Sequence, residues 1–334
     1  MNLKIIRSIL EAIAVGDATG MPVEFMTRQE IREKFGQVDR LLSPEVSLHH
    51  SNLRFAQVTD DTEQNLYLIK EYCTRGYIGI KETALCLLQW AKETGAIEKK
   101  YIGPSSLKAL KWIEEGGDPY KAGLNGTTCG GIMRTPSAVL CGCGKDREFL
   151  AKSVLNCCIP THNTSTALEA AMAYAFAMQE ALDGAKPESV VNAALEGAEM
   201  GIKFAPYRMC AASSAHRIRY LHKILPAINT ADELLDFIYN IFGVGLESED
   251  ICPAVLGIFM YAKEDVWLAI RLGASAGGDT DTVAALAGAL CAAYANGHNI
   301  PHDILDHVKS ENRLDFTALS NDIAKHRMRI CIDE

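Results

Sequence analysis

The chain has 334 residues, of which 48% are hydrophobic and 22% are charged, a composition typical of globular proteins with enough apolar material for a large core. Its 42 acidic residues outnumber its 33 basic residues and give a formal net charge of -9. This charge, together with the absence of any Lys/Arg run, argues against a protein that coats nucleic acid or binds it sequence-specifically, but it does not exclude a single phosphate-bearing ligand.

The sequence shows no feature of export or membrane insertion. Its first residues begin like a signal peptide, but Glu11 interrupts the apolar stretch and Asp17 ends it. The longest apolar run, residues 283–295, is too short and too rich in alanine to span a bilayer. The 11 cysteines are irregularly placed and lack zinc-ligand spacing, which favours reduced, mostly buried thiols. We therefore expect a cytoplasmic protein without a membrane segment.

Helical periodicity dominates the chain from its beginning. Apolar side chains recur at helical spacing through residues 3–13, and the pattern returns in residues 66–73 and 167–178. Further along, Thr230 and Glu233 have the spacing of a capping box, which predicts a helix that begins directly after Thr230.

Two later stretches, residues 254–262 and 283–295, are apolar nearly all round, as is typical of helices inside a bundle. Strand signals are weak throughout, so we predict an all-α fold in which residues 1–334 form one compact domain. The stretches 36–58 and 116–135 lack periodicity and are predicted to be long loops, which in compact domains are usually functional.

Two short segments concentrate acidic and hydroxyl side chains immediately before predicted helices. Either segment alone is explained by helix capping, because Asp and Thr are favoured N-cap residues. Capping needs only one side-chain oxygen, however, and each segment offers two carboxylates. The segments are Thr59-Asp60-Asp61-Thr62 and Asp279-Thr280-Asp281-Thr282.

If the fold brings the two segments together, four carboxylates and threonine hydroxyls converge at helix N-termini, where the helix dipole keeps carboxylates ionised. Carboxylates crowded in this way repel one another unless a cation or a proton lies between them. Oxygen donors suit Mg²⁺ or Mn²⁺ rather than zinc, and so many acids suggest two ions that position a ligand and activate water. The spacing alone leaves open that the segments lie far apart.

A third segment, from Gly16 to Glu24, ends the first predicted helix. Small residues at positions 16, 18 and 20 permit close backbone packing, and Gly16 is interpreted as the helix stop. Glu24 lies just beyond the turn and is either a surface acid or a candidate to orient and activate a water beside the ions.

Together these motifs resemble the ADP-ribosylglycohydrolase family, which contains the dinitrogenase-reductase-activating glycohydrolases and the ADP-ribosyl-acceptor hydrolases. The resemblance runs from residue 16 to residue 282, and the two acidic motifs are its most specific part. The matching stretches, in the order of the family, are Gly16-Asp17-Ala18 with Glu24, Thr59-Asp60-Asp61-Thr62, Gly131-Ile132-Met133-Arg134, Thr161-His162 and Gly278-Asp279-Thr280-Asp281-Thr282.

The resemblance implies an all-α orthogonal bundle with a central cleft that holds two Mg²⁺ or Mn²⁺ ions. It also implies that Glu24, Asp60 and Asp61 are catalytic and that His162 lies near the substrate. Backbone amides of a glycine-containing segment would cradle the substrate diphosphate, since glycine lets N–H groups approach phosphate oxygens closely. That segment is Gly130, Gly131, Ile132 and Met133, and the metal ligands carried over are Thr59, Asp60, Asp61, Asp279, Asp281 and Thr282.

Two departures from the family pattern concern the site. Family members often carry Gly-Asn-Gly before the Met-Arg pair, and here Thr128-Cys129 replaces the first two of those residues. Arginine-directed members often have an acid in an Asp-x-Gly-x-Thr segment, and here Tyr101 takes the place of that aspartate. Loss of this carboxylate would favour lost or redirected catalysis.

The activity that the resemblance implies is metal-dependent hydrolysis of the N- or O-glycosidic bond between ADP-ribose and its acceptor, which reverses mono-ADP-ribosylation. The acceptor is left open and includes an ADP-ribosylated protein (on arginine or serine), a nucleic-acid end, and a small molecule such as O-acetyl-ADP-ribose. Two other classes remain as alternatives. One is a non-catalytic ADP-ribose binder or crystallin-like relative, and the other is a two-metal phosphoesterase acting on nucleotides.

Overall fold

The computed structural model describes residues 2–142, 146–206 and 208–330, and in these residues the predicted all-α fold is confirmed. They form no β-strand, and their one β-type pairing is an isolated antiparallel bridge between Thr128 and Glu247. Within the same residues, no helix combines the length and the apolar character needed to cross a bilayer.

The helices of the first half are α1 (Leu3–Gly20), η1 (Met21–Val23), α2 (Arg28–Phe35), η2 (Pro44–Val46), α3 (Asp60–Arg75), α4 (Ile80–Thr94), α5 (Ala96–Lys99), α6 (Pro104–Glu114), α7 (Gly130–Met133), α8 (Thr135–Cys141) and α9 (Arg147–Cys158). Those of the second half are α10 (Ser165–Leu182), α11 (Pro187–Phe204), α12 (Ser214–Ile224), η3 (Leu225–Ala227), α13 (Ala231–Phe237), η4 (Ile238–Phe242), α14 (Ser248–Ala262), α15 (Val266–Ser275), α16 (Thr280–Ala295), α17 (His302–Asn312) and α18 (Phe316–Ile330).

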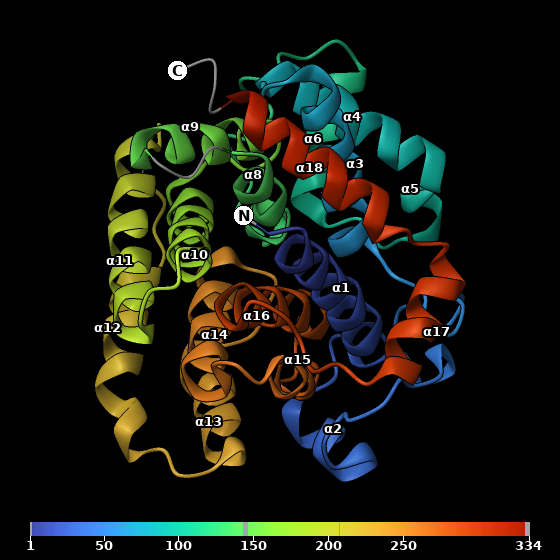
Figure 1. The fold of residues 1–334 in the computed structure, drawn as a ribbon, viewed down its shortest axis with the longest axis vertical. Helices are drawn as coiled ribbons and strands as arrows, with labels where there is room; N and C mark the ends of the chain where they lie inside the picture. Colours follow the sequence, from blue (N-terminus) through green and yellow to red (C-terminus); the bar gives the residue numbers. More distant parts are fainter. Residues whose placement is uncertain (1, 143–145, 207, 331–334) are drawn as a thin grey trace.

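The centre of the molecule is formed by α1 and α16, which pack against each other (Figure 1). Glycines make this contact possible, because an added Cβ would lie 2.6 Å from the Ala284 backbone at Gly16 and 2.5 Å from the Asp281 Cα at Gly20. The prediction that Gly16 stops the first helix is therefore wrong, since α1 continues to Gly20. The glycines serve close packing inside the helix, and they bring the end of α1 to the beginning of α16.

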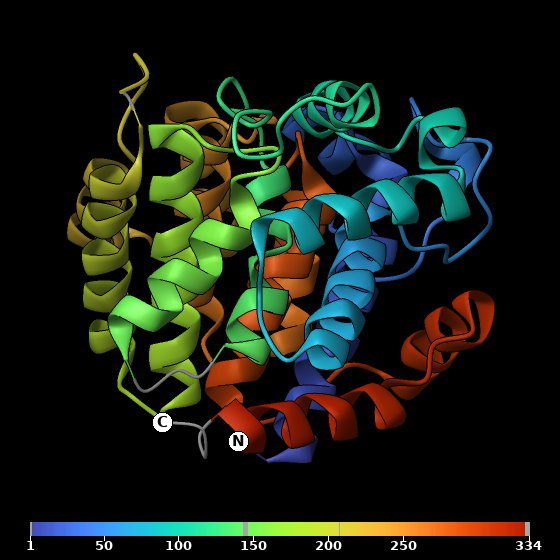
Figure 2. The ribbon, with the colours of Figure 1, turned by 90° about the horizontal axis from the view of Figure 1, so that it is seen from above.

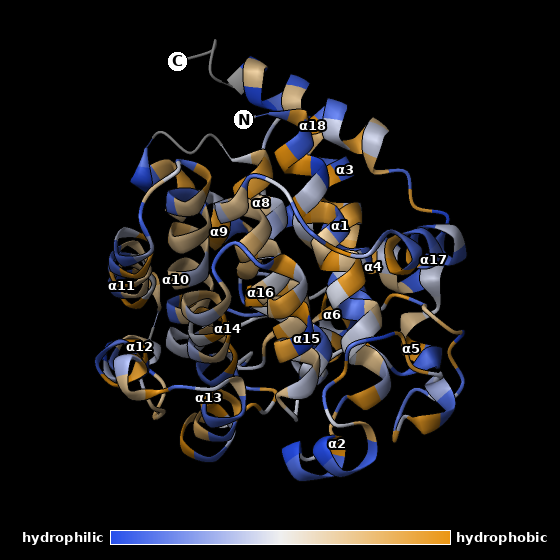
Figure 3. Cartoon of the chain, turned by 60° about the horizontal axis from the view of Figure 1, so that its bottom comes forward, coloured by the Kyte–Doolittle hydropathy of each residue, from blue (hydrophilic) through white to orange (hydrophobic). Residues whose placement is uncertain are grey.

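The predicted buried stretches 254–262 and 283–295 lie in α14 and α16, and nearly all their residues are buried. Figure 3 shows the contrast between the hydrophobic colours of α16 at the centre and the hydrophilic colours of α2 at the rim. The last helices, α17 and α18, both pack against α1 at one edge of the fold, and α18 passes beside the start of α1 (Figure 2). Helix α1 is thus enclosed on several sides, which holds its C-terminal end in place.

The predicted loops agree with the structure in part. Residues 36–58 are irregular apart from η2, whereas the stretch 116–135 becomes helical at α7 and again at α8. The capping box at Thr230 and Glu233 is confirmed, and α13 begins directly after it.

Candidate metal centre

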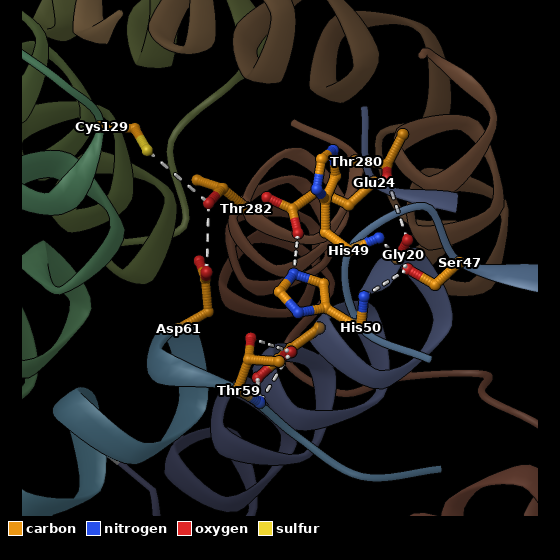
Figure 4. Close-up of polar contacts among 11 residues, drawn as sticks. Gly20, Glu24, Ser47, His49, His50, Thr59, Asp61, Cys129, Thr280 and Thr282 are labelled. Carbon is orange, nitrogen blue, oxygen red and sulfur yellow. Dashed lines mark hydrogen bonds and ion pairs between the residues drawn. The ribbon is translucent and has the colours of Figure 1, made fainter. Parts of the chain in front are cut away.

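The two acidic segments begin α3 and α16, and the structure brings them into contact (Figure 4). Asp60 is the first residue of α3, and Asp279 is the N-cap of α16. The hydroxyl of Thr282 donates a hydrogen bond of 3.1 Å to Oδ2 of Asp61, although these residues are 221 positions apart in the chain. The condition on which a shared cation site depends is therefore met.

Glu24 joins the cluster from the end of η1. One of its carboxylate oxygens and one oxygen each of Asp279 and Asp281 lie within 4.8 Å of one another, and all three residues are buried. Three carboxylates at this separation could hold a divalent cation. Glu24 is therefore a candidate ligand as well as a candidate base.

The backbone at Gly278 holds this group of acids together. Gly278 has a φ of +71°, and an added Cβ would lie 1.7 Å from the carbonyl oxygen of Val244, so only glycine fits. Its carbonyl accepts a hydrogen bond of 2.7 Å from the N–H of Phe25, and its N–H donates one of 2.9 Å to the carbonyl of Met26. These two bonds tie the turn that carries Glu24 to the beginning of α16.

Asp17 fixes the beginning of α3 from the neighbouring helix α1. Its buried carboxylate accepts hydrogen bonds from the backbone N–H and the hydroxyl of Thr59, at 2.9 and 2.7 Å, and from the same groups of Thr62, at 3.1 and 2.6 Å. Because the hydroxyl proton of Thr59 points to Asp17, the lone pairs of that oxygen are left for a cation. Sequence reasoning assigned no role to Asp17, since its partners lie on another helix.

The electrostatics of the cluster favour protons or cations over bare carboxylates. Burial, followed by the charge of a neighbouring carboxylate, raises the pKa of Asp60, Asp61 and Asp281 well above the usual range. Burial and then the charge of Asp281 raise the pKa of Glu24 to about 7, and burial and then the charge of Glu24 raise the pKa of Asp279 to about 6. As anions these groups repel one another unless positive charge lies among them.

Two carboxylate oxygens of the cluster, Oδ1 of Asp61 and Oδ1 of Asp281, are buried and have no hydrogen-bond partner among the described residues. Buried polar atoms normally have a partner, and a cation among the acids would supply one. Carboxylate and hydroxyl oxygens are the donors that Mg²⁺ and Mn²⁺ prefer. The residues present therefore fit a divalent cation of this type.

His50 is a contact of the cluster that the sequence did not reveal. Its Nε2 lies 2.5 Å from Oε2 of Glu24 (Figure 4). Burial lowers the pKa of His50, but the hydrogen bond and the charge of Glu24 outweigh it, and the net pKa is raised. The only signal in the sequence was the position of His50 in the long loop 36–58, because nothing local connects it to Glu24.

The predicted diphosphate segment is a single helical turn, α7, and all four of its residues are buried. The N–H of Met133 donates a hydrogen bond of 2.9 Å to the carbonyl of Cys129. That amide is therefore already engaged within the turn, and a contact between the segment and a diphosphate stays a prediction.

The side chain of His162 lies directly beneath this turn. An added Cβ would lie 2.7 Å from Cε1 of His162 at Gly130 and 3.0 Å from its Cβ at Gly131. The imidazole is fully buried, with Nδ1 2.7 Å from the hydroxyl of Thr161 and Nε2 3.1 Å from that of Thr128. Burial and then the charge of Arg134 lower the pKa of His162 well below the usual value, so the imidazole is neutral. It packs against the buried side of the turn.

A family model described as ADP-ribosylglycohydrolase matches residues 4–331. The chain belongs to this family. The resemblance inferred from the motifs is thereby confirmed over nearly the whole sequence.

Three relatives and one solved structure are similar to this chain. The uncharacterized protein YegU of Escherichia coli is 28% identical over 98% of this chain and 99% of its own length. An uncharacterized protein of Archaeoglobus fulgidus is 28% identical over 93% of this chain and 94% of its own. The ADP-ribosyl-[dinitrogen reductase] glycohydrolase of Rhodospirillum rubrum is 29% identical over 41% of this chain and 44% of its own. A solved chain of an ADP-ribosylglycohydrolase-related protein complex superposes with a TM-score of 0.67 and 24% identity, covering 97% of this chain and 98% of its own, and so shares the fold.

Cys129, which departs from the family pattern, contacts the acidic cluster directly. Its thiol donates a hydrogen bond of 3.0 Å to Oδ2 of Asp279, and its sulfur is 3.9 Å from the hydroxyl oxygen of Thr282. Burial and then the charge of Asp279 raise the pKa of the thiol well above its usual value. Cys129 therefore keeps its proton and orients Asp279.

Tyr101, the second departure from the family pattern, lines a cavity of about 210 Å³ beside the acidic cluster, which we call the inner cavity. Glu24, Asp60 and Asp281 line the same cavity. The hydroxyl of Tyr101 donates a hydrogen bond of 2.8 Å to Oε2 of Glu63. The phenol is thus tied to a carboxylate on α3 and closes one side of the inner cavity.

Proposed function

We propose that this protein hydrolyses the glycosidic bond between ADP-ribose and an acceptor at the cluster formed by the beginnings of α3 and α16. The observation that carries the proposal is the convergence of buried carboxylates from three distant segments beside the inner cavity, with Glu24, Asp279 and Asp281 within 4.8 Å of one another. Membership of the family supports a glycohydrolase in general.

The centre would hold two Mg²⁺ or Mn²⁺ ions, with Glu24 close enough to contribute. When bound, such ions neutralise the acids, hold vicinal ribose hydroxyls and polarise water. The residues that would hold them are Thr59, Asp60, Asp61, Asp279, Asp281 and Thr282.

Glu24 is the candidate to orient the attacking water and to accept its proton as the bond to the acceptor lengthens. Without ions, burial and the charge of Asp281 raise its pKa to about 7, and bound cations would lower that pKa and keep the carboxylate ionised as a proton acceptor. The contact with His50 fixes the orientation of its carboxylate. The surrounding carboxylates would stabilise the positive charge that develops on the ribose, as in other glycosyl transfers.

The substrate diphosphate would lie against the turn formed by Gly130 and Gly131, with Ile132 and Met133 completing it. In this arrangement His162 supports the turn from below. The ribose that carries the acceptor would then reach the inner cavity, where Glu24 and Asp60 lie.

The acceptor is best identified with a panel of defined substrates. Peptides ADP-ribosylated on arginine or serine, ADP-ribosylated nucleic-acid ends and O-acetyl-ADP-ribose are incubated with Mg²⁺ or Mn²⁺ and read by mass spectrometry. We expect release of intact ADP-ribose from at least one class. Release of AMP or inorganic phosphate instead would indicate a two-metal phosphoesterase.

The double variant Asp60→Asn/Asp61→Asn should abolish this release and keep the helical fold. Asp303→Asn/Asp306→Asn changes the charge equally on exposed positions of α17 and serves as the matched control. The binder alternative draws support from Tyr101, a phenol at the position where arginine-directed family members often have an acid. Tight binding of ADP-ribose by the wild-type protein without turnover of any substrate would favour it.

A further inference from the structure

A second cavity, of about 820 Å³, lies near the candidate centre and shares no lining residue with the inner cavity. We call it the outer cavity. Its lining residues come from four separate stretches of the chain, within 54–58, 63–67, 94–99 and 310–314. Its volume falls in the range of small-molecule sites, roughly 300–1,000 Å³.

The turn at residues 99–101 forms part of the partition between the two cavities. Lys99 lines the outer cavity, whereas Lys100 and Tyr101 line the inner one. The hydrogen bond from Tyr101 to Glu63 crosses this partition, because Glu63 lines the outer cavity. A ligand in the outer cavity would therefore adjoin a wall of the candidate site.

The lining of the outer cavity contains three cations and two acids, so it carries an excess of positive charge. Arg54 is paired with Glu311, and Glu63 accepts hydrogen bonds from Tyr101 and from another side chain, the indole of Trp90. The two remaining cations of the lining have no carboxylate within 4.0 Å in the described part of the chain, and they are Lys99 and Arg313. In a chain with a net charge of -9, a cavity whose lining has more cations than acids favours an anionic ligand.

The wall that presents Arg313 is held in a fixed conformation. Asn312 joins α17 to the loop before α3, because its Oδ1 accepts a hydrogen bond of 3.1 Å from the N–H of Val58 and its Nδ2 donates one of 2.7 Å to the carbonyl of Ala56. Arg313 itself is the C-cap of α17, with a φ of +52°, and its N–H donates a hydrogen bond to the carbonyl of Ser310. The end of α17 therefore fixes the backbone from which its side chain extends.

We propose that the outer cavity binds a small phosphate-bearing ligand through Lys99 and Arg313. The guanidinium of Arg313 offers paired donors to phosphate oxygens, and the ammonium of Lys99 adds a point charge. Leu66 and Tyr67 of α3 also line the cavity and supply apolar surface against which a ring packs. A nucleoside phosphate matches this combination of charge, apolar surface and volume. The proposal does not depend on the chemistry of the acidic centre.

Calorimetric titration with ADP in EDTA tests the proposal, since no divalent ion is then present to bridge the nucleotide to the acidic cluster. We expect the wild-type protein to bind ADP and Lys99→Glu/Arg313→Glu to bind it at least about tenfold more weakly, as expected for the loss of two charge-assisted contacts. Arg40→Glu/Lys121→Glu makes the same change of charge at exposed positions outside the cavity and should leave the affinity nearly unchanged.

Lys99 is half-buried and Arg313 is exposed, so both variants should fold, and circular dichroism checks this. The milder Lys99→Gln/Arg313→Gln variant should bind with intermediate affinity. An ADP affinity of the folded Glu variant equal to that of the wild-type protein, or no ADP binding by the wild-type protein, would overturn the proposal. Because the titration measures binding without turnover, its outcome is separate from that of the glycohydrolase assay.

Discussion

Replacing Asp17 by asparagine tests whether this residue holds the beginning of α3 in place. The carboxylate accepts hydrogen bonds from two backbone N–H groups and two hydroxyls, those of Thr59 and Thr62. An asparagine side chain keeps one acceptor oxygen and turns an NH₂ group toward the remaining donors. Some of the buried donors of α3 must then lose their partner.

The expected loss follows from two opposing effects. A hydrogen bond to a charged group contributes about 1.5–3 kcal/mol, and each buried donor left without a partner costs about 1–3 kcal/mol. Against this, Asp17→Asn removes one negative charge that raises the pKa of Asp60, Asp61 and Asp281. When a cation already compensates the acids, removing this charge reduces their repulsion only slightly, and we expect the free energy of unfolding to fall by about 3 kcal/mol. In EDTA, removing the charge reduces the repulsion among the acids more, so the free energy of unfolding should fall by less.

For a chain of 334 residues, an unfolding entropy of about 2.1 cal/mol/K per residue converts about 3 kcal/mol into a fall in Tm of about 4 °C. Scanning calorimetry in saturating Mg²⁺ and in EDTA measures both values. Asp39→Asn, at an exposed acid of the loop 36–58, is the control and should change the free energy of unfolding by less than about 0.5 kcal/mol. An Asp17→Asn variant with wild-type Tm in Mg²⁺ would refute the assignment of Asp17 as the residue that fixes α3.

Three further predictions concern the acidic cluster. Mg²⁺ or Mn²⁺ should stabilise the wild-type protein by about 2.7 kcal/mol at a concentration of 100 times Kd and so raise its Tm. The rise in Tm should vanish in Asp60→Asn/Asp61→Asn and persist in Asp303→Asn/Asp306→Asn. In EDTA, because the folded pKa of Glu24 is raised from 4.5 to about 7, its contribution to stability is fully present below pH 4.5 and lost as the pH rises toward 7; denaturation at several pH values should show this loss, and saturating Mg²⁺ should remove it. Cys129→Ala removes the hydrogen bond to Asp279 and should weaken Mg²⁺ binding about tenfold, whereas Cys129→Ser keeps a donor and should bind nearly as the wild type does; equal calorimetric affinities for the two variants would contradict this role.

The all-α fold and the two acidic segments could be predicted because each rests on local composition, whereas the meeting of the segments was implied only by the family resemblance. Helical periodicity is visible within a few turns, and two carboxylates in one N-terminal turn exceed what capping needs. The same local reasoning failed at Gly16, because its place inside α1 is explained by the backbone of Ala284 on another helix. A glycine that permits close helix packing and a glycine that ends a helix look alike in one sequence.

The contacts that the sequence did not reveal are those that cross between elements. Asp17 caps α3 from α1, and His50 reaches Glu24 from an irregular loop, so neither has a partner at a recognisable spacing. Neither residue is one of the predicted oxygen donors, but each orients one of them: Asp17 directs the hydroxyl of Thr59, and His50 holds the carboxylate of Glu24. A sequence motif thus identifies the oxygen donors of such a centre, whereas the groups that set their orientation and protonation are determined by helix packing and become visible only in three dimensions.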